Sequence, residues 1–258
     1  MTKFIVIASG KGGVGKTTAV LNIGKVLADF GREVIVVDAD LTKPNIGLHL
    51  GSPAVSSTLH DVLRGEKSIK EVIYVHPSGL KVIPGSISMK DLERLEPENL
   101  GKVLRELDGF AEIVLIDAAP GISKETIAAI RAADEMLVVV NPNMLSITDA
   151  LKTIKTAEKH GVKVIGVLVN RISNSRDELS KKNIEALLEK KVIAEIPEDE
   201  DMKKALKLKH PVLYSHPGSK SSIPFKKLAA LLIGQHYDAP LHPDSRFSGF
   251  LKKIGIKE

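Results

Sequence analysis

The sequence predicts an α/β fold built on a doubly wound, mostly parallel sheet with helices on both faces. Short segments rich in Val and Ile recur along the 258 residues, and most are apolar at every position. Strands that are covered on both faces have this composition. Between them lie longer segments whose apolar residues repeat every three or four positions, which is the spacing of an amphipathic helix. Strands that alternate with such helices form parallel βαβ crossovers.

Each expected strand is a short apolar run. The runs are Phe4–Ala8, Val34–Val37, Leu80–Ile83, Ile113–Ile116, Met136–Val140, Val162–Val169 and Val192–Ile196. Each expected helix is marked by an apolar stripe. The stripes lie within Ala19–Phe30, Asn99–Leu107, Ile127–Ile130, Ile147–Ile154, Ile184–Leu188 and Leu228–Leu232. We expect one domain over residues 1–237, a proline-containing linker over 238–245 and a short segment over 246–258.

The composition excludes several classes of protein. Hydrophobic residues make up 43% and charged residues 27% of the chain, which is the balance of a globular protein and not of a disordered or fibrous one. No apolar run approaches the roughly 18 residues that span a bilayer. The chain has no cysteine, which excludes disulfides, thiolate zinc sites and cysteine-held iron–sulfur clusters. A cytoplasmic location is therefore expected.

Positive charge is concentrated toward the C-terminal end. Residues 202–258 carry 11 Lys and Arg against 3 acidic residues, a net charge of +8, whereas residues 1–201 have a net charge of −3. This asymmetry favours a surface that meets an anionic partner, either a membrane or a nucleic acid. A solubilising coat of lysines is the alternative interpretation.

A glycine-rich segment after the first predicted strand indicates phosphate binding. It matches G-x-x-x-x-G-K-[ST], the P-loop pattern, and an amphipathic helix follows it. Glycines let the backbone surround a phosphate with N–H donors, and the helix N-terminus favours the same anion. Lys16 would neutralise the β- and γ-phosphates, and the Thr17 hydroxyl would bind Mg²⁺. The expected nucleotide-binding residues of this loop are Gly10, Lys11, Gly12, Gly13, Val14, Gly15, Lys16, Thr17 and Thr18.

The presence of a second lysine early in this loop makes it resemble the deviant P-loop of the MinD/ParA family of ATPases, and the chain is most similar to the MinD-like members. The resemblance implies a P-loop NTPase fold, ATP or ADP with Mg²⁺ as cofactors, and catalytic roles for Lys11, Lys16 and Asp40. In that family the early lysine, here Lys11, reaches across a nucleotide-sandwich dimer to the phosphates of the partner. A lone surface lysine is the alternative.

Two further segments resemble the switch regions of the same family. Val37–Leu41 looks like switch I, in which Asp40 would orient the attacking water and is a candidate metal ligand. Ile113–Gly121 looks like the Walker B strand and switch II, in which Asp117 would hold Mg²⁺ through a water. The alternative for Asp38 and Asp40 is that they only cap the end of a strand.

The family resemblance also assigns a base site and a partner face. Asn170 would recognise adenine with its amide, and Pro197 would pack beside the base. An ordinary strand-terminal asparagine is the alternative for Asn170. The segment Asn141–Asp149 resembles one near the dimer and partner-binding face, although Ser146 or Thr148 would serve equally well as an N-cap of the next helix.

The last residues have the pattern of a basic amphipathic helix. The apolar residues fall at i, i+3, i+4 and i+7, and lysines flank them. The expected membrane-contacting residues are Phe247, Phe250, Leu251 and Ile254. MinD proteins end in a similar membrane-targeting helix. A C-terminal helix docked on its own domain is the alternative.

Together these features predict a MinD-like ATPase that forms a homodimer when ATP is bound. We expect it to bind the inner face of the cell membrane peripherally through the C-terminal segment and to position the division site or a related structure. A protein activator or effector is also expected. The alternative is a ParA-like partitioning ATPase that binds DNA nonspecifically, with steep salt dependence.

Overall fold

The computed structural model describes residues 1–52, 55–92 and 95–238. Within them the chain forms one sheet with the strand order β3-β4-β2-β5-β1-β6-β7-β8. The strands are β1 (Lys3–Ala8), β2 (Val34–Ala39), β3 (Tyr74–Val75), β4 (Lys81–Ile83), β5 (Ile113–Ala118), β6 (Glu135–Val140), β7 (Lys163–Ile172) and β8 (Val192–Pro197). Neighbouring strands are parallel except for the antiparallel pair β3 and β4. The predicted doubly wound, mostly parallel sheet is confirmed.

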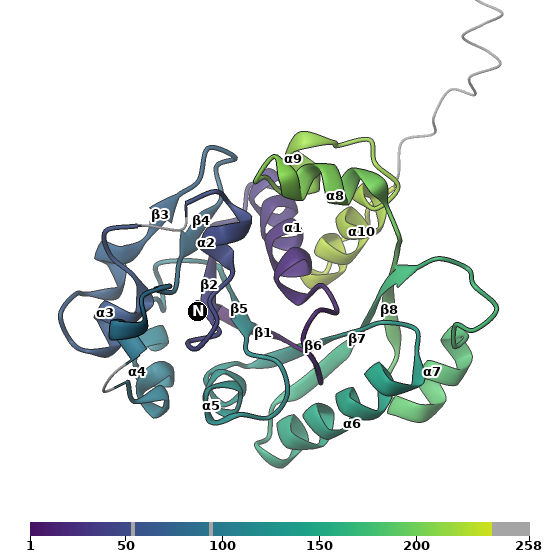
Figure 1. The fold of residues 1–258 in the computed structure, drawn as a ribbon, viewed down its shortest axis with the longest axis horizontal. Coiled ribbons are helices and arrows are strands. Elements are labelled where there is room, and N and C mark those ends of the chain that lie inside the picture. The colour runs from purple at the N-terminus through teal and green to yellow at the C-terminus, as the bar shows by residue number, and fades with distance from the viewer. Residues whose placement is uncertain (53–54, 93–94, 239–258) are drawn as a thin grey trace, which may run out of the picture.

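Helices cover both faces of this sheet (Figure 1). One layer contains α1 (Lys16–Asp29), α8 (Glu200–Lys207), α9 (Val212–Ser215) and α10 (Ser222–Leu232). The opposite layer contains α4 (Leu100–Arg105), α5 (Lys124–Ala132), α6 (Met144–Lys159) and α7 (Lys181–Leu188). The short helices α2 (Ile46–His49) and α3 (Leu59–Leu63) lie near the β3 edge. Three 3₁₀ turns complete the described helical segments, at Ile69–Val72, Met89–Leu92 and Pro97–Asn99.

The central strand β1 shows why its sequence is apolar at every position. Residues 4–8 are completely buried. Phe4 and Val6 pack into the core under α4, α5 and α6, whereas Ile5 and Ile7 pack into the core under α1 and α10. Successive side chains of a strand point to opposite faces, so a strand between two helical layers has no solvent-facing position.

Several elements differ from the sequence-based prediction. The sequence-based prediction does not include strand β3 or the helices α2, α3, α8 and α9, because each has eight residues or fewer and buries few apolar side chains. Helix α8, for example, buries only Ala205. Strand β7 continues past Val169 to Ile172, so Asn170 lies within the strand and not after it.

The predicted C-terminal segment lies outside the described residues, and with it Phe247, Phe250, Leu251 and Ile254. Its membrane role and the 238–245 linker therefore stay predictions. Among the residues that the structure does describe, no helix has both the length and the apolar character that crossing a bilayer requires.

Candidate functional site

The predicted site residues meet at the carboxyl edge of the sheet. The P-loop follows β1, Asp40 follows β2, Asp117 lies near the end of β5 and Asn170 near the end of β7. The strand register places Asp117 beside Asp38 on one side and Ile7 on the other. Because parallel strands end at a common edge, residues far apart in sequence converge where open α/β sheets bind ligands.

Lys16, Thr17 and Asp117 form the centre of this site. The Lys16 ammonium lies 3.0 Å from Asp117 Oδ1, and the Thr17 hydroxyl donates to Asp117 Oδ2 at 2.6 Å. A hydroxyl and a carboxylate oxygen at one point are the hard donors that Mg²⁺ prefers. The three residues therefore fit a magnesium-bound polyphosphate, with Thr17 and Asp117 toward the cation and Lys16 toward the anion.

Two glycines are required by the geometry of the P-loop. Gly15 caps α1 with a φ of +95°, and a Cβ there would lie 2.2 Å from the Asn170 side-chain nitrogen. A Cβ on Gly10 would lie 2.1 Å from the backbone carbonyl carbon of Asp149. The loop is therefore packed against both β7 and α6, and any larger residue would displace one of them.

The two aspartates of β2 and its following loop have different environments. Asp38 is fully buried, and its Oδ2 accepts the backbone N–H groups of Asn45 and Ile46 at 2.9 and 2.8 Å. Burial, with the charge of Asp117 beside it, raises the pKa of Asp38 well above its usual value. Asp38 thus anchors the loop that leads into α2. Asp38 therefore does more than cap the end of β2, because the N–H groups that it accepts belong to residues seven and eight positions further along the chain.

Asp40 faces the phosphate side of the site. Its Oδ1 accepts the backbone N–H of Lys43 at 2.9 Å, and burial raises its pKa above the usual value. Together with Lys11, Lys16 and Thr17 it lines a cavity of about 320 Å³ at the N-terminus of α1. Unpaired N–H groups at a helix start and two ammonium groups make this cavity suitable for a polyphosphate.

A second cavity of about 260 Å³ adjoins the first, and both are lined by Gly15, Thr18 and Arg171. Asn170 and Pro197, the predicted base-site residues, lie together in its wall. The Asn170 amide donates to the Val14 carbonyl at 2.8 Å. This bond ties the predicted base reader to the P-loop.

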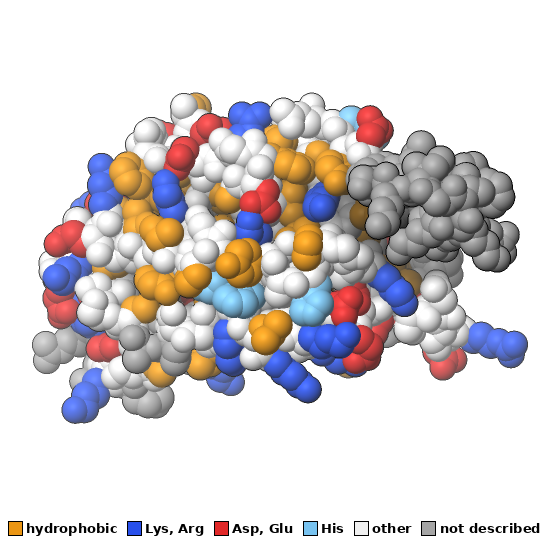
Figure 2. Space-filling model, turned by 90° about the horizontal axis from the view of Figure 1, so that it is seen from above, with side chains coloured by type: hydrophobic (Ala, Val, Ile, Leu, Met, Phe, Trp, Pro, Cys, Tyr) orange, Lys and Arg blue, Asp and Glu red, His pale blue; other side chains and the backbone are white. Residues whose placement is uncertain are grey.

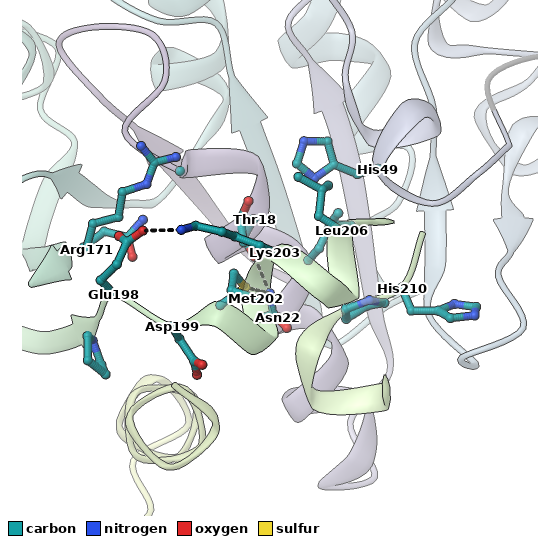
Figure 3. A pocket seen from close by; sticks show the side chains of 15 residues that line it. Thr18, Asn22, His49, Arg171, Glu198, Asp199, Met202, Lys203, Leu206 and His210 are labelled. Carbon is teal, nitrogen blue, oxygen red and sulfur yellow. Dashed lines mark hydrogen bonds and ion pairs between the residues drawn. The ribbon is translucent and has the colours of Figure 1, made fainter. Parts of the chain in front are cut away.

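Several lining residues of this second cavity were not predicted. Figure 3 shows Arg171, Lys203 and His49 around it, with Lys203 directed toward Glu198. Arg171 adopts a φ of +59°, a conformation that non-glycine residues rarely keep without a reason. In the sequence, the one indication that Arg171 belongs to the site is its position directly after Asn170. Burial lowers the pKa of His49, which therefore favours the neutral imidazole.

The predicted partner segment forms the start of α6. The N-cap is Asn143, whose side chain accepts the N–H of Ser146 at 3.0 Å. The interpretation of Ser146 or Thr148 as the cap is therefore wrong. The Ser146 hydroxyl instead accepts the N–H of Asn141, and the Thr148 hydroxyl donates to the Met144 carbonyl.

The chain is similar in sequence and structure to known nucleotide-binding proteins. Residues 5–212 match the model of the CobQ/CobB/MinD/ParA nucleotide binding domain. An uncharacterised ATP-binding protein of Methanocaldococcus jannaschii is 44% identical over 252 residues, covering 97% of this chain and 96% of that protein. The septum site-determining protein MinD of Pyrococcus horikoshii, solved with Mg-ADP, is 32% identical with a TM-score of 0.86, covering 90% of this chain and 96% of that one. The MinC:MinD cell division complex of Aquifex aeolicus contains a chain that is 29% identical with a TM-score of 0.82. The match covers 93% of this chain and 99% of that one.

Proposed function

Because the chain belongs to the CobQ/CobB/MinD/ParA family of nucleotide-binding proteins, we propose that it is a MinD-like, Mg²⁺-dependent ATPase that hydrolyses ATP to ADP and phosphate. The observation that supports this most strongly is the contact of Lys16 and Thr17 with Asp117 in a cavity that Asp40 also lines. A related MinD protein, that of Pyrococcus horikoshii, was solved with Mg-ADP.

Each residue has a distinct role in this proposal. The P-loop amides and the start of α1 hold the phosphates, and Lys16 neutralises the charge that develops on them. Thr17 and Asp117 would hold Mg²⁺, the first through its hydroxyl and the second through a water. Asp40 orients the attacking water, which a carboxylate can do without being a strong base. Asn170 and Pro197 hold the adenine.

ATP acts in this proposal as a switch for dimerisation. Lys11 lines the phosphate cavity, and in the proposed dimer it would contact the nucleotide of a second copy. The γ-phosphate then supplies the difference in free energy between the monomeric and dimeric states that a population shift requires. Turnover by the isolated protein is expected to be slow, because a partner protein would complete the site.

The switch would control reversible membrane binding through residues 246–258, and with it the positioning of the division site or a related structure. Two copies of a weakly binding helix gain affinity through effective concentration, so the dimer binds where the monomer does not. The named relatives support this assignment, since they are septum site-determining and cell division proteins.

Sedimentation with anionic liposomes tests the proposal. The full chain and a truncation before Arg246 are each mixed with vesicles of phosphatidylglycerol and phosphatidylcholine, with Mg-ATP or Mg-ADP. We expect the full chain to sediment with ATP but much less with ADP, and the truncation to stay in the supernatant. Equal sedimentation of both proteins would contradict the membrane role of this segment.

A partitioning ATPase that binds DNA is the second candidate, and the net charge of +8 over residues 202–258 favours it. Figure 2, however, shows that on the side that carries α8 and α9 the described basic side chains are mixed with acidic and apolar ones and form no continuous stripe. Retardation of nonspecific duplex DNA by both the full chain and the truncation, lost steeply with salt, would favour this candidate over the membrane ATPase.

A further inference from the structure

The loop that follows Asp40 is held by a side chain from α5. The Thr42 backbone N–H donates to Glu125 Oε2 at 3.1 Å, and the Thr42 hydroxyl donates to Glu125 Oε1 at 3.1 Å. One carboxylate thus binds both polar groups of a residue that lies two positions after Asp40. Hydrogen bonds to a charged acceptor are stronger than those between neutral groups.

Glu125 is itself firmly placed. It lies in the first turn of α5, where the helix dipole favours a negative charge. The helix is capped by Ser123, whose side chain accepts the N–H of Thr126. The Thr126 hydroxyl donates to the Ala119 carbonyl at 3.0 Å, which ties this turn to the segment that follows Asp117. Glu125 therefore joins the loop after β2 to the loop after β5.

The same loop is held from its other side by a histidine. His60 Nε2 lies 2.9 Å from the Leu41 carbonyl, and His60 Nδ1 accepts the N–H of Ser86 at 3.1 Å. The imidazole is fully buried, and this burial lowers its pKa. Residues 41 and 42 are thus fixed to two different elements, α3 and α5, directly after Asp40.

We propose that Glu125 is a positioning residue for Asp40. By holding Thr42 to α5, Glu125 fixes the loop in the conformation that places the Asp40 carboxylate in the phosphate cavity. Because α5 is tied to the segment after Asp117, the position of Asp40 then depends on that segment. Glu125 does not itself line that cavity in the part of the chain that the structure describes. The inference rests on the proposed ATPase function, because it assigns a role in the hydrolytic step.

Kinetics of Glu125 variants test this role. Glu125→Ala removes both acceptors and is expected to lower kcat by about tenfold to 100-fold, since small misplacements of a reacting group have effects of this size. The dissociation constants of ADP and of a nonhydrolysable ATP analogue should change by less than about threefold, because Glu125 lies outside the cavity. Lys124→Ala, an exposed change in the same helical turn, is the control and should leave all these constants unchanged.

Two further variants separate positioning from general damage to the fold. Glu125→Gln keeps an oxygen for the Thr42 N–H and an amide that donates to the Thr42 hydroxyl, so it should restore most of kcat. The double variant Thr42→Val, Glu125→Ala should have the same kcat as Glu125→Ala alone. The Thr42 hydroxyl acts only through Glu125, so its removal has no further effect once Glu125 is absent. A Glu125→Ala protein that turns over at the wild-type rate, or fully multiplicative effects in the double variant, would overturn the proposal.

Hydrogen exchange keeps this test independent of the ATPase proposal. The Thr42 amide should exchange at least about tenfold faster in Glu125→Ala than in the wild type, because its acceptor is lost. If the wild-type protein hydrolyses no ATP, the proposed function fails, and with it the positioning role of Glu125 in hydrolysis. Unchanged exchange at Thr42 would instead contradict the contact itself, whatever the rate of hydrolysis.

Discussion

The Lys16 ammonium and the Asp117 carboxylate form an ion pair of 3.0 Å in which both side chains are more than nine-tenths buried. Buried charges of this kind are stable only as a pair, because each would otherwise lose its hydration without compensation. The pair therefore couples the P-loop to β5. It also keeps the Lys16 ammonium at the site, where it would neutralise a bound phosphate.

Removing one member of this pair should destabilise the fold. Lys16→Ala leaves Asp117 buried beside Asp38, and the free energy of unfolding should fall by about 3 kcal/mol. Urea denaturation without nucleotide measures this. Lys3→Ala is the control, because its 2.7 Å pair with Glu135 is partly exposed and should contribute about 1 kcal/mol or less. Equal losses in the two variants would show that burial of the Lys16 pair has no special effect.

Asp38 should make the stability of the protein depend on pH. Its pKa is raised in the folded state, so its contribution to stability is complete below its ordinary pKa of 3.8 and is lost as the pH rises through the raised value. Asp38→Asn keeps one oxygen for the Asn45 and Ile46 N–H groups, since both donate to the same atom. The variant should therefore gain stability relative to the wild type as the pH rises.

Denaturant unfolding of both proteins at about pH 5 and about pH 8 measures this difference. A difference in unfolding free energy that stays constant between the two pH values would show that Asp38 does not titrate abnormally.

Asp40 should affect hydrolysis and leave nucleotide binding largely unchanged. Asp40→Asn keeps an acceptor for the Lys43 N–H but loses the negative charge, and kcat should fall by about 100-fold or more. In the wild type the rate should fall on the acid side as the carboxylate is protonated, at a pH above 3.8 because burial raises this pKa. Steady-state rates across the pH range test both points. Wild-type turnover by the variant would exclude Asp40 from the chemistry.

Much of the fold could be predicted from the sequence because the central strands are buried on both faces. Val34–Val37 and Ile113–Ile116 are apolar at every position, and both lie in the sheet as expected. Short elements that bury few side chains have no comparable run of apolar residues in the sequence. Strand β3 has two residues, and α8 has eight residues of which only Ala205 is buried, so each offers too short an apolar pattern to be recognised.

The site could be predicted where a residue is part of a contiguous motif, as with Lys16 and Thr17. Contacts between distant segments could not. Glu125 and Thr42 are 83 positions apart, and nothing in either local sequence indicates that they meet. Arg171 lines both cavities and adopts a positive φ, and the sequence alone reveals neither.

Lys11 should affect dimerisation more than binding. Lys11→Ala removes one lining side chain of the phosphate cavity while Lys16 and the loop amides remain. ATP affinity should therefore decrease by less than about tenfold, whereas ATP-dependent dimerisation should be lost. Sedimentation velocity with ATP in an Asp40→Asn background, in which hydrolysis is slow, measures the dimer fraction. An unchanged dimer fraction would rule out a cross-subunit role for Lys11.

Gly15 should be essential for the base site as well as for the phosphate loop. Gly15→Ala imposes a side chain at positive φ and displaces the Asn170 amide, so ATP affinity should fall by about tenfold or more. Gly31→Ala is a matched control, because it has a similar φ of +77° but nothing within 4 Å of the added Cβ. The control should lose only about 1 kcal/mol of stability and bind ATP normally. Normal ATP binding by Gly15→Ala would contradict the contact with Asn170.

Isothermal titration calorimetry with adenine nucleotides tests the central claim most directly. The wild-type chain with Mg²⁺ should bind ATP and ADP at one site per chain. Lys16→Ala, checked to be folded by circular dichroism, should release no heat of binding under the same conditions. Absence of nucleotide binding by the wild type, or equal binding by the two proteins, would contradict the assignment of residues 10–18 as the phosphate-binding loop.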